Sequence, residues 1–276
     1  MFAALVIVLR EVIEAGLIVG IVLAVTRPVA HARRWIAGGV AFGIAGSLLV
    51  AMFTTGLASA LSGMGQEYFN ATILTVAVVM LSWHNIWMTS HGRQLAGELK
   101  ATGAEVASGA RSVAALAIVV GVAVLREGSE VVLFLYGIIV SGGETPWSLF
   151  VGGLAGLALG AGFTALTYLG LVHIPVRYLF AVTSALIAFL AAGMAAQAVA
   201  FLEQAGAITV LGKTVWNTSW LLPQTSLFGR VLHTLVGYMD RPSEIELLVY
   251  LTTLAVIFGL SRVANTRAAQ QQVHSA

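Results

Sequence analysis

The amino-acid sequence predicts an all-α integral membrane protein of about seven transmembrane helices. Hydrophobic residues make up 59% of the 276 residues, whereas charged residues make up only 9%. Soluble proteins carry roughly 25% charged residues, because their surfaces face water. The mean hydropathy of +0.94 agrees with this contrast. The apolar residues also form long runs separated by short polar segments, as in helices that cross a bilayer.

Seven apolar runs approach or exceed the roughly 20 residues that a helix needs to cross the hydrocarbon core. We predict spans over residues 2–25, 35–60, 67–89, 112–138, 146–171, 176–202 and 244–262. The first span is not expected to be a signal peptide, because no basic segment precedes it and Arg10, Glu11 and Glu14 interrupt its apolar run.

The basic residues between the spans predict the orientation. Nine of them fall on one side: Arg27, Arg33, Arg34, Arg93, Lys100, Arg111, Arg177, Arg262 and Arg267. The other side has only Lys213, Arg230 and Arg241. Cytoplasmic loops carry the excess of Lys and Arg, so we expect an N-terminus outside, a C-terminus in the cytoplasm and a location in the plasma membrane (the inner membrane of a bacterium). This distribution accounts for the net charge of +2 without a nucleic-acid partner.

Two segments are not expected to span the bilayer. Residues 205–243 form a long outer loop, in which apolar residues at helical spacing over 227–236 predict a short helix that lies in the outer interface or caps the bundle. Residues 265–276 are polar and predict a short, disordered cytoplasmic tail. A small-residue face for close helix packing is predicted on the fifth span, from Gly152, Gly153, Gly156, Gly160 and Gly162.

A six-residue motif occurs twice. Leu9-Arg10-Glu11-Val12-Ile13-Glu14 recurs as Leu125-Arg126-Glu127-Gly128-Ser129-Glu130, three spans later. An odd number of spans means that the two motif helices run in opposite directions. We therefore predict a single transmembrane domain over 1–264, built as a 3+3 inverted repeat plus one C-terminal helix; repeat one covers 1–90 and repeat two covers 112–204. Such repeats place the substrate site near the bilayer midplane.

The motif residues predict a cation site. Residues three and four apart share a helix face, and ionisable groups inside a bilayer cost about 2.5–3.5 kcal/mol each, so they should face the protein interior. Carboxylates supply hard oxygen ligands, and the chain has no cysteine for a thiolate site. These oxygens alone do not separate iron from manganese or magnesium. The predicted metal ligands are Glu11, Glu14, Glu127 and Glu130, with Arg10 and Arg126 balancing their charge.

Other interpretations stay open at this point. The motifs could be buried Arg–Glu pairs that only join helices, although two excess carboxylates in a duplicated set favour an ion site. Glu67, at the outer end of the third span, could attract cations or be a solvated acid near a helix N-terminus. His84, within that span, could line the ion pathway or be an ordinary interior histidine.

At the two motifs the sequence resembles the oxidase-dependent iron permease family, the iron/lead transporters that include bacterial and fungal high-affinity iron permeases. Members carry R-E-x-x-E in helices 1 and 4. The stretches over 81–88, 226–229 and 237–238 add support. The resemblance implies seven helices, iron ions as transported substrate with no permanently bound cofactor, and the motif glutamates as ligands along the path.

The resemblance also implies a partner: an oxidase, or a periplasmic iron-binding or peroxidase protein. Members often carry a further glutamate where this chain has Asn70, which leaves Glu67 as the acid at the outer mouth. Fe3+ delivered by an oxidase and Fe2+ both remain possible substrates. The alternatives are a proton-coupled transporter of another divalent metal and a glutamate-dependent intramembrane protease using His84 and Asn85. A hydrolytic site needs a single acid–base set, so duplication of the motif favours a transporter over an enzyme.

Overall fold

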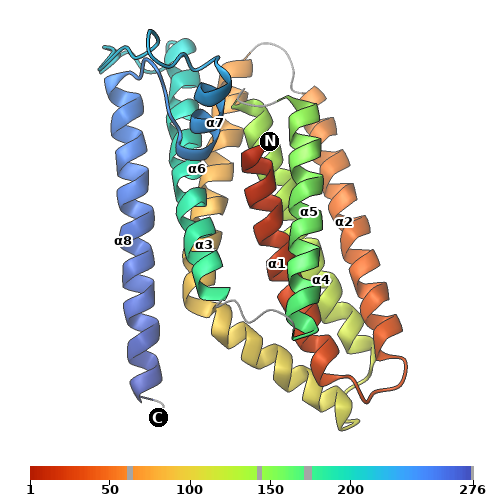
Figure 1. Cartoon of the computed structure of the whole chain (residues 1–276). Helices are drawn as coiled ribbons and strands as arrows, with labels where there is room; N and C mark the ends of the chain where they lie inside the picture. The colour runs from red at the N-terminus through yellow and green to blue at the C-terminus, as the bar shows by residue number, and fades with distance from the viewer. Residues whose placement is uncertain (61–64, 142–144, 171–175, 275–276) are drawn as a thin grey trace.

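The computed structural model of the chain describes residues 1–60, 65–141, 145–170 and 176–274. Within these ranges the structure is all-α, and its only β pairing is an isolated bridge between Thr214 and Ser243. Long helices lie side by side, and the two termini lie toward opposite ends of the molecule (Figure 1). The helices are α1 (Phe2–Val25), α2 (Ala32–Ala60), α3 (Gln66–Ala107), α4 (Ala114–Val140), α5 (Pro146–Tyr168), α6 (Val176–Gln204), α7 (Leu227–Val236) and α8 (Glu244–His274).

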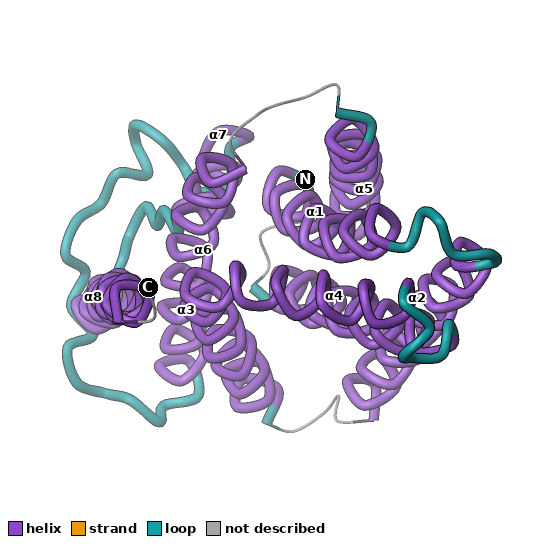
Figure 2. The backbone as a smooth tube through the Cα atoms, turned by 90° about the horizontal axis from the view of Figure 1, so that it is seen from below, coloured by secondary structure: helices purple, strands orange, loops and turns teal. Residues whose placement is uncertain are grey.

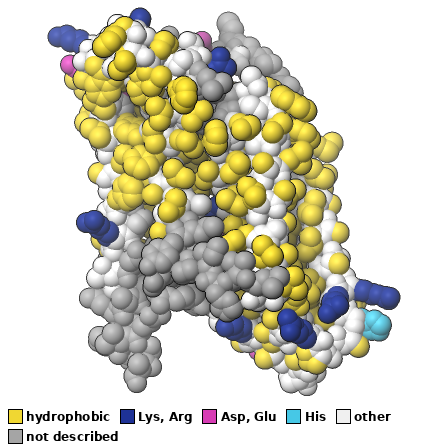
Figure 3. Space-filling model, in the orientation of Figure 1, with side chains coloured by type: hydrophobic (Ala, Val, Ile, Leu, Met, Phe, Trp, Pro, Cys, Tyr) yellow, Lys and Arg dark blue, Asp and Glu magenta, His cyan; other side chains and the backbone are white. Residues whose placement is uncertain are grey.

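Five segments of the described chain are long and apolar enough to cross a membrane: Ala32–Thr54, Gln66–Met88, Pro146–Tyr168, Ala181–Gln204 and Glu244–Ala264. Helices α1 and α4, with 24 and 27 residues, have the same reach but carry three charged residues each. Large apolar side chains point outward, with Phe42 68% and Trp83 72% exposed. Figure 3 shows hydrophobic side chains covering the flank, with most Lys and Arg toward the two ends. The prediction of an all-α membrane protein is confirmed.

The motif helices α1 and α4 pack against each other, and each also packs against the second helix of the other half of the chain. Thus α1 lies against α5 and α4 lies against α2, while α3 lies against α6 (Figure 2). If α1, α2 and α3 are exchanged for α4, α5 and α6 respectively, the same set of pairs is obtained. This is the pattern that an inverted repeat produces, and it brings the two motifs together.

Glycines allow the close approach of these pairs. Along α5, Gly152, Gly156 and Gly160 face α1, and a Cβ on Gly156 would lie 2.6 Å from the carbonyl oxygen of Leu5. A corresponding stripe on α2 faces α4: a Cβ on Gly39 would lie 2.5 Å from the carbonyl oxygen of Ala117. Small residues at such spacing are typical of packed membrane helices.

The predicted glycine face on the fifth span is only partly right. A Cβ on Gly162 would meet no atom within 4 Å, and one on Gly153 would reach only Val8, at 3.9 Å. These two glycines therefore lie beside the contact with α1 and not in it, because only every fourth residue of the stripe stays on the contact face.

Helix α3 is longer than predicted. The span over 67–89 is found, but the helix continues through the expected loop to Ala107 and ends where Gly109 adopts a φ of 80°. At about 1.5 Å per residue its 42 residues exceed the bilayer thickness. The added part passes across the end of the bundle (Figure 1), where Leu99 and Val106 are buried in an apolar cluster with residues of α1, α2 and α4. Hydropathy located the span but not the amphipathic extension.

The segment over residues 205–243 contains the predicted short helix, α7. It begins after Ser226, whose hydroxyl accepts a hydrogen bond from the Gly229 amide at 3.0 Å, and it ends at Gly237 with a φ of 69°. It packs against α6 and α1, so it caps the bundle. His233 is buried on its inner side; burial lowers the pKa of this imidazole, although its hydrogen bond to the carbonyl of Tyr238 acts in the opposite direction.

The C-terminal tail was predicted to be disordered from residue 265, but α8 continues to His274. Residues 265–274 are rich in alanine and glutamine, which favour helix, and they extend a helix already formed by the last span. Residues 171–175, which include the end of the fifth predicted span, lie outside the described part of the chain, as do the side chains of Arg93, Arg177 and Arg267.

Candidate metal site

The first motif lies on the inward face of α1. Arg10, Glu11 and Glu14 are each only 1% exposed. Their spacing places them on one side of the helix, and α4 and α3 pack against α1 on that side. Helix α5 covers a different side of α1, through Val8 and Val12. This meets the expectation that charged groups in an apolar span face the interior.

The second motif lies on α4 and faces the first. Glu127 is 2% exposed and Glu130 is 9% exposed. Gly128, between them in the sequence, faces Ser47 of α2. The small Gly128 thus accommodates the α2 contact on one side of α4 while the glutamates occupy another.

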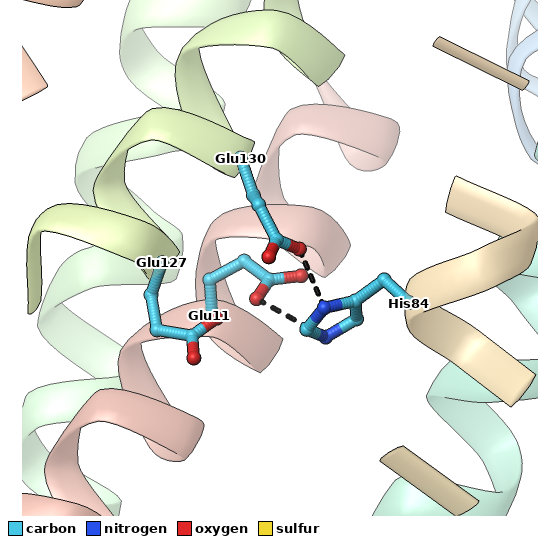
Figure 4. A group of neighbouring side chains, drawn as sticks. All are labelled: Glu11, His84, Glu127 and Glu130. Carbon is cyan, nitrogen blue, oxygen red and sulfur yellow. Dashed lines mark ion pairs between the residues drawn. The ribbon is translucent and has the colours of Figure 1, made fainter. Parts of the chain in front are cut away.

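Helix α3 adds His84 between the two motifs (Figure 4). The imidazole is 5% exposed. Its Nδ1 lies 2.6 Å from Oε2 of Glu130, and its Nε2 lies 3.2 Å from Oε2 of Glu14. Nε2 is also 3.9 Å from Oε2 of Glu11. His84 therefore links carboxylates of α1 and α4. The neighbouring Asn85 orients this part of α3, because its amide donates to the carbonyl of Ser184 in α6 at 3.2 Å.

The two arginines pair within their own motifs. Nε of Arg10 lies 2.8 Å from Oε1 of Glu14, and its Nη1 lies 3.9 Å from Oε1 of Glu11. In the second motif, Nε of Arg126 lies 3.3 Å from Oε1 of Glu130, and its Nη2 lies 3.3 Å from Oε1 of Glu127. Each arginine therefore pairs with the glutamate four residues on, as the spacing suggested.

Four side chains could hold a metal ion together: Glu11, His84, Glu127 and Glu130 each offer one ligand atom, and these atoms lie within 4.8 Å of one another. Three of the four predicted ligands belong to this group. Glu14 lies at its edge, where it pairs with Arg10 and His84. Four ionised glutamates and two arginines give the whole cluster a formal charge of −2, which favours a bound cation.

The remaining candidate, Glu67, lies apart from this cluster, as does Glu203, which the sequence did not assign to the site. Glu67 is exposed in the first turn of α3, roughly 25 Å along the helix from His84 at 1.5 Å per residue. Glu203, at the end of α6, accepts a hydrogen bond from the Ser243 hydroxyl at 3.0 Å and so fastens α6 to the start of α8. One signal pointed to His84 in the sequence: it and Asn85 form a polar pair within a span whose only charged residue is Glu67.

Apolar helices surround a buried, negatively charged group of side chains whose ligand atoms lie within 4.8 Å of one another. This arrangement is that of a membrane transporter of cations. The chain belongs to the Iron permease FTR1 family, whose sequence model matches residues 1–267. The family predicted from the paired motifs is thereby confirmed.

Curated relatives match along the whole chain. The Ferrous iron permease EfeU of Shigella sonnei (strain Ss046) is 31% identical over 280 aligned residues, which cover 98% of this chain and 99% of that protein. The Ferrous iron permease EfeU of Escherichia coli O157:H7 gives the same values. No solved structure matches. The relatives are permeases, so the chain is a transporter and not an enzyme, and the intramembrane-protease alternative is set aside.

Proposed function

We propose that this chain imports iron through a mid-membrane site to which both R-E-x-x-E motifs contribute. One observation carries the proposal: carboxylates from α1 and α4 and an imidazole from α3 converge, buried, within 4.8 Å of one another. The iron permease family supplies the identity of the ion.

The energetics favour an ion site over a purely structural one. Each ionised group in a bilayer costs about 2.5–3.5 kcal/mol on insertion scales, and replacing a buried ion pair by apolar residues is often neutral or stabilising. A helix contact alone would not require four glutamates. Glu11 in particular has only long ion pairs, both 3.9 Å, to Arg10 and His84. An incoming cation would meet a carboxylate that is weakly engaged.

Fe2+ is the proposed form of the ion, since the curated relatives are named ferrous iron permeases. The positive-inside distribution supports import from an outer face that bears α7 into a cytoplasm at the other end, across the inner membrane of a bacterium. The outer segment exposes Trp220 (80%) and Phe228 (72%). A periplasmic iron-binding, peroxidase or oxidase partner that delivers the ion would meet this face of the molecule.

Uptake of radiolabelled iron by cells lacking their own iron importers tests this proposal. Glu11→Gln and Glu127→Gln keep the side-chain shape and remove the negative charge, and we expect each to reduce uptake to the background of empty-vector cells. Glu105→Gln is the matched control, because Glu105 lies on the extension of α3 and its side chain is 53% exposed. Normal uptake by both motif variants, at equal membrane abundance, would show that the motifs are structural.

The same assay distinguishes iron from another divalent metal. Unlabelled Fe2+, Mn2+, Zn2+ and Mg2+ are added in excess, with ascorbate to keep iron reduced. We expect Fe2+ to compete most strongly; stronger competition by Mn2+ or Zn2+ would favour the alternative substrate.

A further inference from the structure

The cluster holds one nitrogen donor that neither motif supplies. His84 comes from α3, a helix whose membrane span has Glu67, in its first turn, as its only charged residue, yet its imidazole is buried among the motif carboxylates. Packing alone would be satisfied by an apolar side chain at this position, so a polar ring here points to a task within the site.

The distances around the ring suit a metal ligand. Two neighbouring ligands of an octahedral ion at about 2.1 Å from the metal are roughly 3.0 Å apart, and two opposite ones are roughly 4.2 Å apart. Nε2 of His84 lies 3.9 Å from Oε2 of Glu11, a member of the four-residue group, and 3.2 Å from Oε2 of Glu14 at the edge of that group. These separations fall in the range that ligands of one ion would have.

The other ring nitrogen has the partner that a ligating histidine needs. Nδ1 lies 2.6 Å from Oε2 of Glu130, so an Nδ1–H donates to that carboxylate. Nε2 is hydrogen-bonded to Oε2 of Glu14 at 3.2 Å, and an ion bound between the ring and the α1 carboxylates would replace that bond at the Nε2 lone pair. Metal-binding histidines commonly donate a hydrogen bond from their second ring nitrogen to a carboxylate, which fixes the orientation of the ring and its tautomer.

We propose that His84 binds the transported ion through Nε2 and sets the metal selectivity of the site; this inference rests on the proposed function. Carboxylate and water ligands suit Mg2+, Ca2+ and Mn2+, whereas imidazole suits Fe, Zn, Ni and Cu. An all-carboxylate site would accept the abundant Mg2+. The imidazole raises the preference for Fe2+ over Mg2+ and Ca2+.

Pulsed EPR with Mn2+ as the probe tests the bond. Purified protein in detergent receives one equivalent of Mn2+, and electron spin echo envelope modulation reports nitrogen bound to the ion. We expect 14N modulation in the unaltered chain, replaced by 15N frequencies when the protein is made with 15N-histidine. This comparison needs no substitution and so does not depend on a variant's folding.

Two substitutions assign the nitrogen. His84→Gln should abolish the modulation, and His233→Gln, at the buried histidine of α7, should leave it unchanged. Loss of a group that only supports a metal ligand typically lowers metal affinity about 10- to 100-fold. Loss of the ligand itself, in His84→Gln, should therefore lower the ratio of Fe2+ to Mg2+ affinity by at least about tenfold.

The outcomes separate the two proposals. If Mn2+ binds stoichiometrically, is lost in Glu11→Gln, and shows no nitrogen modulation in the unaltered chain, His84 is not a ligand and the carboxylate site stands. If modulation persists in His84→Gln, another nitrogen binds the ion and the inference is overturned. If the unaltered chain binds no Mn2+, Fe2+ or Co2+, the proposed function itself fails.

Discussion

At the scale of single residues, the two motif arginines have different surroundings. Arg10 is 1% exposed and pairs closely with Glu14. The side chain of Arg126 is 36% exposed, and its guanidinium lies over the ring of Trp87, 5.1 Å from the ring centroid. The motifs are identical in their charged residues, yet only the first arginine is sealed inside the bundle.

This difference predicts unequal effects of removing each charge. Arg10→Met leaves Glu11 and Glu14 buried without their guanidinium, and breaking a buried pair typically costs about 3–5 kcal/mol. Arg126→Met should cost clearly less, because Arg126 is less buried and its ion pairs with Glu127 and Glu130 are longer, both 3.3 Å against 2.8 Å for Arg10 and Glu14. Unfolding of the two variants in the same detergent measures the difference. Equal destabilisation would mean that the two arginines are equally essential to the fold.

The sequence predicted which charged residues belong to the site, but it did not predict which of their side chains lie closest together. Six ionisable residues in two apolar spans had to face inward, and their spacing placed them on common faces. The sequence did not reveal that His84 would join three of the glutamates while Glu14 remained beside Arg10. That depends on how far α3 is rotated about its axis, which is set by packing against α6 and by bonds such as Asn85 to Ser184.

At the scale of helices, glycine spacing controls how closely α1 and α5 approach. A Cβ at Gly156 would lie 2.6 Å from a backbone oxygen of α1, which cannot move aside alone. Because α1 carries three of the charged side chains of the cluster, displacing it would also disturb the site.

Gly156→Ala should therefore lower both thermal stability and iron uptake. Gly162→Ala is the matched control on the same helix, since its Cβ would meet nothing within 4 Å; we expect it to be neutral or slightly stabilising, because alanine favours helix over glycine by up to about 1 kcal/mol. Melting temperatures and uptake are measured for both variants. Comparable behaviour of the two would contradict close packing at Gly156.

Helix positions could be predicted to within a few residues where hydropathy defines them, as for α1 and α4. The extension of α3 and the end of α8 could not be predicted in this way. Both consist of polar sequence outside the apolar spans, where hydropathy does not indicate a helix. Leu99 and Val106 form the buried face of the α3 extension. Two apolar residues in a polar stretch are too few to predict an amphipathic helix from the sequence.

At the scale of the whole molecule, the antiparallel course of α1 and α4 explains why one short motif had to occur twice. Repeating the motif three spans later presents it from the opposite direction, so glutamates from both copies meet. The sequence predicted this from counting spans. It could not predict that α1 would pack on α5 and α4 on α2, an exchange between halves that arises from the two glycine stripes.

The predicted orientation can be measured because the chain has no cysteine. Ala110→Cys lies in the turn between α3 and α4, and Ala207→Cys lies in the segment after α6, which is predicted to face outside; both positions are exposed. A membrane-impermeant thiol reagent added to intact spheroplasts should label only Ala207→Cys, and both should react after lysis. Labelling of Ala110→Cys alone would reverse the topology and the inferred direction of import.

The most direct test of the central claim, that the two motifs build one iron site, is anomalous scattering from crystals soaked in Fe2+ under reducing conditions. Data collected on both sides of the iron absorption edge locate the ion without reference to activity. We expect a single peak in the space between Glu11, His84, Glu127 and Glu130, absent from crystals of Glu11→Gln. Two separate peaks, one at each motif, or occupancy only at the exposed Glu67, would contradict it.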